Sequence, residues 1–283
     1  MLFCCELNVE RILKKILLKI LKVKVFVAVV ELGFALLILQ ACWDQAISSK
    51  QNPSLVTIQG NQVSYSGKLI GVSPDSVRMS AQKELEAAGF YPKLPDGVLV
   101  PEITRLKDGR IWLSGGVGSS NTYSRNTWFF DSKTKQLSKG PALAKESIKH
   151  ATLLLADGKV LVSGGSTPRP LEIELVQMMD PKANSMISIG KLIFARYEHS
   201  MVELSPGIIA ITGGATRNGD QDEVEIFDTN IGRSRMVGHL AAPRKQHDSL
   251  KIDSNHVLVL LGRGFDYKVQ EMEPEVFVIP ESK

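Results

Sequence analysis

Cysteine is scarce in this 283-residue chain and is confined to one end of it. The three cysteines are Cys4, Cys5 and Cys42. The sequence after Cys42 therefore has no disulfide framework and no thiolate that could hold a metal or act as a nucleophile. A domain without disulfides can fold in an oxidising or a reducing compartment, so cysteine content alone does not place the protein.

An excess of charge of one sign is also missing from most of the chain. The formal net charge is +4, from 34 basic and 30 acidic residues. The first 42 residues hold six of the basic and three of the acidic residues, which leaves 28 basic and 27 acidic residues after them. Binding of nucleic acid depends on clustered Lys and Arg, so this nearly neutral remainder predicts no nucleic-acid partner.

The first 42 residues have the layout of an export signal. Residues 11–24 are basic, with Ile and Leu at helical spacing, and residues 25–41 are almost wholly apolar. A basic region, an apolar region and a small residue, here Ala41, are typical of a secretory signal. Residues 39–42, Leu-Gln-Ala-Cys, resemble the lipobox of bacterial lipoproteins. The resemblance implies that Cys42 becomes the lipidated first residue of the mature chain.

An uncleaved anchor is the main alternative to this signal. Residues 25–43 are long enough to span a bilayer as a helix. Glu31 lies inside that stretch, and a carboxylate disfavours a permanent span more than a transient signal. A third alternative is a chain that is not exported. We predict that residues 1–42 are a signal peptide or membrane anchor, and that the protein is held in the cell envelope by a lipid or by one N-terminal helix.

Residues 43–94 form a second segment of distinct composition. Residues 44–54 are polar and predict a flexible tether. Two β-rich runs around Gly60-Asn61 predict a hairpin. A run of helix formers from Asp75 to Ala88, followed by Gly89, predicts a short helix that ends at the glycine.

From residue 95 onward, a β-rich run ends in a glycine pair at nearly fixed intervals. The three complete pairs are Gly115 and Gly116, Gly164 and Gly165, and Gly213 and Gly214. In a fourth copy, Leu261 stands in the first position and Gly262 in the second. The second glycines are 49, 49 and 48 residues apart. A period of about 50 residues in an all-β pattern is typical of propeller blades.

The first three copies also predict four short strands each, whereas the last copy ends in its third strand, at residues 275–283. A turn rich in Asp, Pro, Gly and Asn precedes every glycine position, which favours a hairpin between the flanking runs. A third β run ends in an acidic residue in three copies, and a fourth run follows it. The acidic residues are Asp131, Asp180 and Asp228, and the fourth runs centre on Leu137, Ile187 and Met236.

Residues 95–283 resemble the kelch family, and within it the bacterial copies of the form R-x-x-H-S…L-x-D-G-x-V-x-V-x-G-G. The resemblance implies an all-β, kelch-type β-propeller with four recognisable blades. Kelch propellers usually close with six or seven blades, and an open ring leaves strand edges exposed. The chain could form a tight four-bladed ring, an incomplete ring completed by another chain, or a truncated product. A strand from residues 54–72 could also complete the last blade.

Three histidines repeat in register with the glycine pairs. His150, His199 and His247 each stand fourteen residues before the first glycine position, and Arg196 and Arg244 precede the last two by three residues. Imidazole is a common metal ligand. Equivalent placement in successive blades nevertheless favours a repeated structural hydrogen bond. We therefore predict no metal site and no cofactor.

The loops after the glycine pairs vary in sequence and are the predicted contact surface. They span residues 118–125, 166–171 and 216–222. The candidate binding residues in them are Ser119, Asn121, Thr167, Arg169, Arg217 and Asp220. Loops on a rigid scaffold commonly carry binding function. We expect a non-catalytic protein that binds a protein or glycan.

An enzyme acting on a carbohydrate is the alternative function. A hydrolase or epimerase could use acids of the blade loops with Arg196 or Arg244 in a central funnel. Copper oxidation of the galactose oxidase type is excluded, because that family's site needs a tyrosine cross-linked to a cysteine and no cysteine follows Cys42.

Overall fold

The computed structural model describes residues 56–59, 62–65, 68–72, 74–91, 94, 96–118, 122–168, 172–264 and 272–280. The chain divides into two units, Met1–Pro53 and Ser54–Lys283, and every described residue belongs to the second. Cys42 and the loop candidates Ser119, Asn121 and Arg169 lie outside the described residues. In the described part, no helix has the length and apolar character needed to cross a bilayer.

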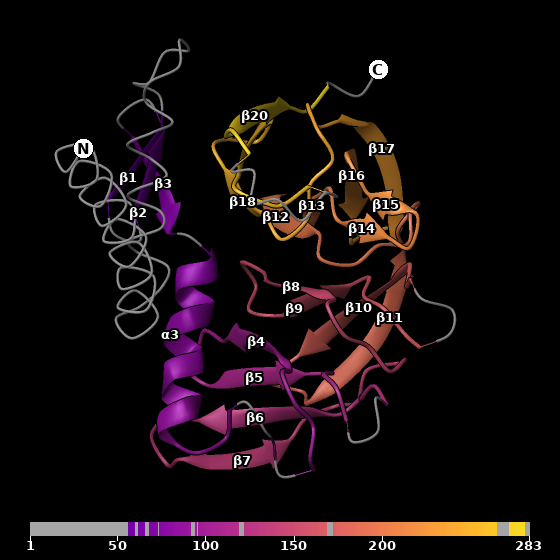
Figure 1. Cartoon of the computed structure of the whole chain (residues 1–283). Coiled ribbons are helices and arrows are strands. Elements are labelled where there is room, and N and C mark those ends of the chain that lie inside the picture. Colours follow the sequence, from indigo (N-terminus) through magenta and orange to yellow (C-terminus); the bar gives the residue numbers. More distant parts are fainter. Residues whose placement is uncertain are drawn as a thin grey trace, which may run out of the picture. The chain divides into compact units, whose positions relative to one another are not determined.

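The described chain is mostly β, as predicted, with a series of antiparallel sheets (Figure 1). The first sheet has the order β4-β5-β6-β7, formed by Glu102–Arg105, Ile111–Ser114, Thr127–Asp131 and Gln136–Lys139. The second has the order β11-β10-β9-β8, with β8 to β11 formed by Ala151–Leu154, Val160–Ser163, Leu175–Asp180 and Ser185–Lys191. The third has the order β12-β13-β16-β17, formed by Ser200–Ser205, Ile208–Thr212, Glu223–Asp228 and Arg233–His239.

The remaining elements are a fourth sheet, a short ribbon, an N-terminal sheet and one helix. The fourth sheet has three strands in the order β18-β19-β20, formed by Asp248–Lys251, His256–Leu260 and Glu275–Val278. A two-stranded ribbon, β14 and β15, joins β13 to β16 and spans Ala215–Thr216 and Gly219–Asp220. At the N-terminal side, β1, β2 and β3 form a sheet of their own from Val56–Gln59, Gln62–Tyr65 and Lys68–Val72. Helix α3, Pro74–Ala87, follows it.

Local chemistry explains where the turns fall. Between the first two strands of the first and second sheets, Asp108 and Asp157 accept the backbone N–H two residues on, at 3.0 and 2.9 Å. Each of those turns also contains a glycine in the left-handed region, which a side chain would strain. At the end of β6, Asp131 accepts the backbone N–H groups of Lys133 and Thr134 at 2.8 and 3.2 Å. These bonds hold the pKa of Asp131 below its ordinary value.

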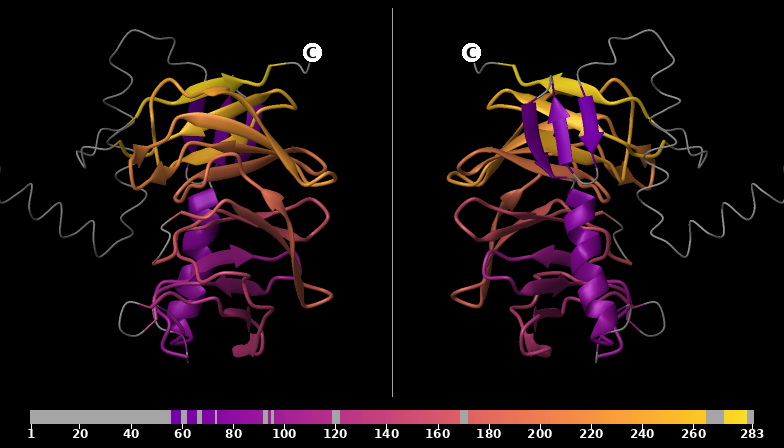
Figure 2. Two further views of the ribbon diagram at one scale, coloured as in Figure 1. Left: turned by 90° about the vertical axis from the view of Figure 1, so that its right-hand side faces the viewer. Right: turned by 90° about the vertical axis from the view of Figure 1, so that its left-hand side faces the viewer.

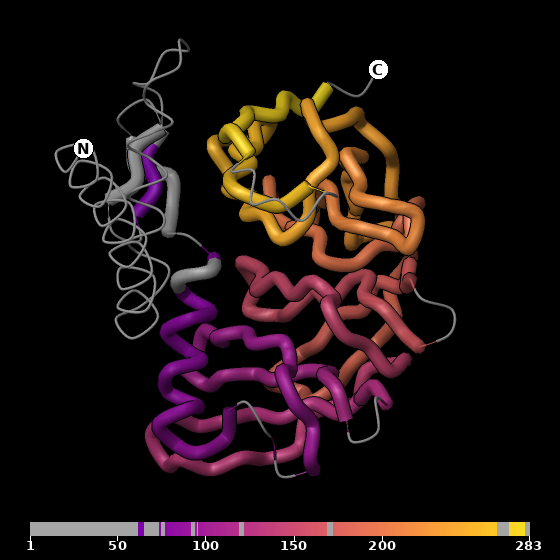
Figure 3. Tube along the Cα trace, viewed as in Figure 1, coloured from indigo at the N-terminus to yellow at the C-terminus, as the bar shows by residue number. Residues whose placement is uncertain are grey.

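The backbone trace shows the sheets following one another in chain order (Figure 3). Apolar side chains, mainly of the middle strands, pack between successive sheets. Trp112 and Phe129 of the first sheet meet Val160 and Met179 of the second. The second and third sheets share one cluster, and the third and fourth share another. The first strands of neighbouring sheets, β4, β8, β12 and β18, lie side by side in that order. The core is therefore a series of layers between sheets.

The N-terminal segment covers the two end faces of this series (Figure 2). Ala81 and Leu85 of α3 are fully buried against the free face of the first sheet. Val63 of β2 is fully buried against the free face of the fourth sheet, beside Leu250 and Leu258. Only one residue separates β3 from α3, so one continuous segment contacts both end sheets.

This arrangement corrects one sequence-based prediction and supports another. The helix and the hairpin are present, with α3 ending just before Gly89. The strand exchange considered for residues 54–72 is not found, because in the described part of the chain β1, β2 and β3 pair with one another and not with β18, β19 or β20. The hairpin gains a third strand, β3, and contributes an apolar contact to the fourth sheet in place of a paired strand.

Candidate functional site

The repeated histidines link neighbouring sheets. In each case, the imidazole Nε2 lies within hydrogen-bonding distance of the hydroxyl that precedes the previous glycine pair. The three pairs are Ser114 with His150 at 2.8 Å, Ser163 with His199 at 2.7 Å, and Thr212 with His247 at 2.8 Å. All six side chains are buried. Each bond therefore connects the second strand of one sheet to the residue just before the first strand of the next sheet.

The glycine pairs make room for these histidines. A Cβ atom on Gly164 would lie 2.7 Å from Cε1 of His199, the histidine of the next sheet. A Cβ on Gly165 would lie 2.9 Å from Cβ of His150, the histidine of its own sheet. Both glycines also have positive φ, 62° and 105°. Sterics and backbone conformation therefore both require glycine at these two positions.

The first and fourth repeats depart from the glycine–histidine pattern, and contacts between neighbouring repeats explain both departures. Pro101 stands in the first repeat where the later repeats have histidine, and a Cβ on Gly116 would lie 3.2 Å from its Cα. Leu261 stands in the fourth repeat where the others have the first glycine, and it is 36% exposed. No histidine of a following repeat packs on Leu261 among the described residues, so a side chain is tolerated there.

The histidines are neutral in the folded protein. Burial lowers the pKa of His150 to about 4 and that of His247 to about 3. Burial, followed by the nearby charge of Arg196, lowers the pKa of His199 well below its ordinary value. The Nδ1 atoms of the three rings have no hydrogen-bond partner among the residues that the structure describes. Within the described ranges, no group of three or more His, Cys, Asp or Glu residues could hold a metal ion.

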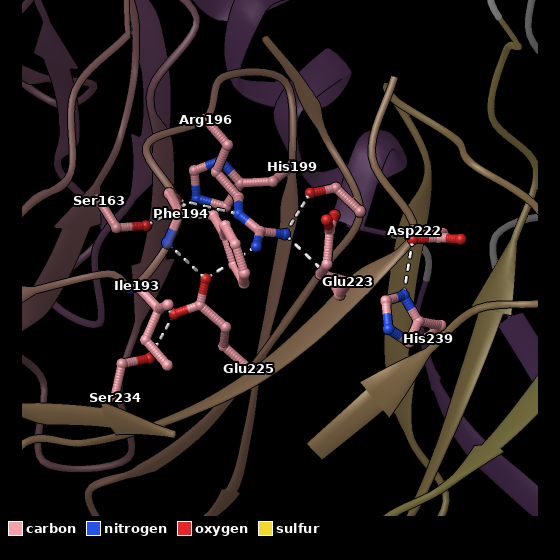
Figure 4. Close-up of polar contacts among 11 residues, drawn as sticks. Ser163, Ile193, Phe194, Arg196, His199, Asp222, Glu223, Glu225, Ser234 and His239 are labelled. Carbon is pink, nitrogen blue, oxygen red and sulfur yellow. Dashed lines mark hydrogen bonds and ion pairs between the residues drawn. The ribbon is translucent and has the colours of Figure 1, made fainter. Parts of the chain in front are cut away.

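Arg196 forms a buried ion pair (Figure 4). Its Nη2 lies 2.7 Å from Oε1 of Glu225, and both side chains are 0% exposed. Its Nη1 donates to the carbonyl oxygens of Gly213 and Glu223 at 2.6 and 3.0 Å. The guanidinium thus links the loop before β12, which contains Arg196, to the end of β13 and to β16. It does not face an open funnel, as the enzyme alternative would require.

The equivalent positions in the second and fourth sheets have a similar role. In the fourth sheet, Arg244 pairs with Glu275 at 2.7 Å. In the second sheet, where serine replaces the arginine, Gln177 accepts the backbone N–H of Ala144 at 2.7 Å. Glu225 and Glu275 likewise accept backbone N–H groups from the loops that enter β12 and β18. These side chains fasten each entering loop to the third strand of its own sheet.

A cavity of about 450 Å³ lies between the loops of the first and second sheets. Its lining has two basic and two acidic side chains among small and apolar ones. The lining residues are Arg125, Ala144, Lys145, Glu146, Thr167, Pro168, Glu172 and Ile173. Thr167 is thus the one described candidate that lines the cavity, and Arg125 closes the predicted first loop. The volume is within the range of small-ligand sites.

The two candidates of the third loop have different surroundings. The backbone N–H of Arg217 donates to Glu172 Oε1, which joins this loop to the cavity wall. Asp220 is paired with Lys245 at 2.8 Å, and its side chain is only 2% exposed. The structure therefore brings Thr167 and the backbone of Arg217 to the same wall, and it places Asp220 beneath Lys245.

A row of strained residues was not foreseen from the sequence. The residue before each histidine, and before Pro101, has positive φ: Val100, Lys149, Glu198 and Gln246, with φ of 49–56°. Glu198 N–H donates to Lys149 O at 3.0 Å, and Gln246 N–H donates to Glu198 O at 2.9 Å. Their side chains also join, because Glu198 Oε1 contacts Lys149 Nζ at 2.7 Å and Gln246 Nε2 at 2.8 Å.

This row lies close to the cavity along the chain, since Lys149 follows Glu146 of the cavity wall by three residues. Non-glycine residues with positive φ cost of order 1–3 kcal/mol each and often mark functional positions. Their only trace in the sequence is a polar residue before each histidine, a pattern too weak to indicate backbone strain.

No known protein family matches the chain, and no curated protein is similar to it.

Proposed function

We propose that the protein is a non-catalytic, kelch-type β-propeller that binds a protein or glycan through the loops after its glycine pairs. It is exported and tethered to the membrane of the cell envelope through residues 1–42. The observation that carries the binding proposal is the cavity between the first two loops, with Arg125, Lys145, Glu146 and Glu172 around Thr167. Mixed charges in a concave site suit a ligand with several polar groups.

The propeller assignment has support from the packing. Three four-stranded sheets and one three-stranded sheet succeed one another along the chain, one for each repeat of the glycine pattern. The first strands of successive sheets are neighbours. The segment from β1 to α3 covers the two outer faces of the series. In this proposal, that segment stands between the fourth and first blades and takes the place of further blades.

The non-catalytic assignment has support from the roles of the residues that suggested chemistry. His150, His199 and His247 are buried, neutral and bonded to hydroxyls of the preceding sheet. Arg196 and Arg244 are paired with glutamates inside the sheets. None of these five side chains is placed to meet a substrate in solution.

A glycan array and an immobilised peptide library would test the binding proposal with the full chain. We expect saturable binding to one of them that falls at least about tenfold, or 1.4 kcal/mol, in Arg125→Ala and Lys145→Ala. Lys133→Ala, which removes an exposed cation from the turn between β6 and β7, is the control and should bind normally. Equal binding by all three variants would exclude the cavity, and about one equivalent of copper or zinc would contradict the non-catalytic assignment.

Mass spectrometry of the protein isolated from its native membrane would test the tether. We expect a chain that starts at Cys42 and carries a lipid on it. Cys42→Ser should remain uncut and lose the lipid. An uncut chain with an unmodified Cys42 in the wild type would contradict the lipoprotein proposal.

A further inference from the structure

Among the described residues, the fourth sheet has no partner strand at the position where the other three sheets have a fourth strand. In the first, second and third sheets, the third strand pairs on its outer side with β7, β11 or β17. In the fourth sheet, β20 pairs with β19 alone within the described residues. In the described part of the chain, the outer backbone groups of β20 therefore have no strand partner.

Contacts with the neighbouring sheet show that β20 is the structural equivalent of β16. A Cβ on Gly190 of β11 would lie 2.9 Å from Cζ of Phe227 in β16. A Cβ on Gly238 of β17 would lie 3.0 Å from Cζ of Phe277 in β20. In both cases, a glycine in the fourth strand of one sheet admits the phenylalanine of the next. The outer edge of β20 is thus in the position that β17 fills in the third sheet.

The outermost strands of the other sheets carry protection that β20 lacks. β7 and β11 end in Lys139 and Lys191, and β17 contains Arg233 and Arg235. Register shifts also interrupt the pairing of β11 and β17 with their neighbours. Lysines, arginines and irregular pairing protect an edge against further strands.

By contrast, β20 reads Glu-Val-Phe-Val, and Val278 is 56% exposed. Its one charged side chain, Glu275, is paired with Arg244. Pro274 and Pro280 flank the strand, and proline cannot donate to a ladder, so the edge accepts only a short segment.

The third sheet indicates which chemistry fits that edge. Glu225 accepts four bonds, one of them from Ser234 Oγ of the fourth strand at 2.5 Å. Its equivalent, Glu275, bonds to Arg244 and to the backbone N–H of Ala241, has no fourth-strand donor among the described residues, and is 17% exposed. An added strand with a hydroxyl at the position of Ser234 would supply the missing donor.

Charge adds a second criterion. Each existing fourth strand ends in a basic side chain that contacts an acidic or aromatic group. The contacts are Lys139 Nζ 5.6 Å from the centre of the Trp128 ring, Lys191 Nζ 2.7 Å from Glu174, and His239 Nδ1 2.8 Å from Asp222. In the fourth sheet, the exposed Glu273 precedes β20 and offers the same kind of partner.

We propose that the outer edge of β20 binds an extended, basic, hydroxyl-containing segment of another protein, which adds to the fourth sheet as an antiparallel strand. Backbone bonds to β20 supply the affinity, and Glu273 and Glu275 select the segment. This interaction is separate from the cavity between the first two loops, so either proposal can fail alone.

A synthetic peptide with the sequence of residues 232–240, which contains β17, is a defined probe for this edge. We expect the full chain to bind the labelled peptide saturably in a fluorescence anisotropy titration. The same peptide with proline in place of its methionine cannot form a regular strand and should bind at least about tenfold more weakly. Absence of saturable binding, or equal binding of the two peptides, would overturn the proposal.

Two lysine substitutions locate the binding on the protein. Val278→Lys protects the edge of β20 and should weaken peptide binding at least about tenfold. Ile187→Lys adds the same charge at a similarly exposed apolar residue of β11 and should leave binding unchanged. Equal weakening by both variants would overturn the proposal. A dimer of the unliganded chain that Val278→Lys dissociates would also overturn it, since a second copy would then occupy the edge.

Discussion

At the level of single residues, the glycine pair and the histidine form one structural unit shared by two sheets. A glycine of one sheet lies against the histidine of the next, and the hydroxyl before that glycine bonds to the same imidazole. The hydroxyl, the glycine and the histidine are therefore required together. Their spacing along the chain reflects contacts between repeats more than the internal structure of any one repeat.

Gly164→Ala should be strongly destabilising. The new Cβ would lie 2.3 Å from the carbonyl oxygen of Arg196, and the backbone has φ of 62°. We expect a loss of about 2–4 kcal/mol in the free energy of unfolding, measured by urea denaturation. Gly109→Ala is the matched control, because it has φ of 89° and nothing within 4 Å of the new Cβ. Similar losses in both variants would show that backbone strain, without steric overlap, sets the requirement for glycine.

The buried histidines predict acid sensitivity. The folded-state pKa values of His150 and His247, about 4 and about 3, lie below the ordinary value of 6.5. As the pH falls below 6.5, the unfolded chain binds protons before the folded one does. Stability is therefore complete above that pH and declines towards pH 4 by up to about 1.4 kcal/mol per pH unit for each histidine.

Urea denaturation between pH 7 and pH 4.5, followed by tryptophan fluorescence, measures this decline. His150→Gln should be less stable at pH 7 and should show a smaller slope, because one titrating group is gone. An unchanged slope in that variant would mean that other groups cause the acid sensitivity.

At the level of elements, the buried arginine–glutamate pair fastens a loop to a sheet. Glu225 accepts N–H groups of Ile193 and Phe194 while it pairs with Arg196, so the loop before β12 is held to β16. A pair with no exposure contributes little net Coulomb energy after desolvation. Loss of one partner is much more damaging, because it leaves a buried charge.

Arg196→Ala should therefore lower the free energy of unfolding by about 3–5 kcal/mol. Lys191→Ala breaks an ion pair of the same length, 2.7 Å to Glu174, but the two side chains are 67% and 44% exposed. That control should change stability by less than about 1 kcal/mol. Chemical denaturation of both variants compares the two, and a small effect of Arg196→Ala would show that water reaches Glu225.

The sequence was sufficient to predict the elements whose cause is local. The turn residues, the acids that end β6, β10 and β16, and the helix stop at Gly89 all act on backbone groups a few residues away. Contacts between repeats were harder to predict. Ser114, Ser163 and Thr212 stand before the three complete glycine pairs, but their partners lie 35 or 36 residues further on. The cavity requires loops of two repeats, so it could be predicted only as variable segments.

At the level of the whole molecule, the segment from β1 to α3 completes the hydrophobic core. The end faces of the series are apolar, and without a cover they would expose the side chains that now meet Leu85 and Val63. The period of the glycine pairs gave no indication of this role, because the segment does not carry the repeat. The hairpin and the helix were predictable as elements, but the sheets they cover were not.

Leu85→Ala should lower the free energy of unfolding by about 2–5 kcal/mol, since it leaves a cavity against the first sheet. Val77→Ala on the same helix is the control, because Val77 is 40% exposed and its loss should cost at most about 0.5 kcal/mol. If α3 unfolds with the sheets, far-ultraviolet circular dichroism and tryptophan fluorescence will report one transition. Two separate transitions would show that the helix is not part of the cooperative core.

The contact of Val63 with the fourth sheet has a consequence for the order of synthesis. Val63 and its partners Leu250 and Leu258 are separated by roughly 190 residues, so this is a contact of very high sequence separation. At about 5–20 residues per second, the ribosome makes the hairpin roughly 10–40 s before it makes the sheet that buries it. During that interval, the sheets can assemble in order from the N-terminal side while the hairpin has no partner. Docking of the hairpin on the fourth sheet therefore cannot precede synthesis of that sheet, and we expect it late in folding.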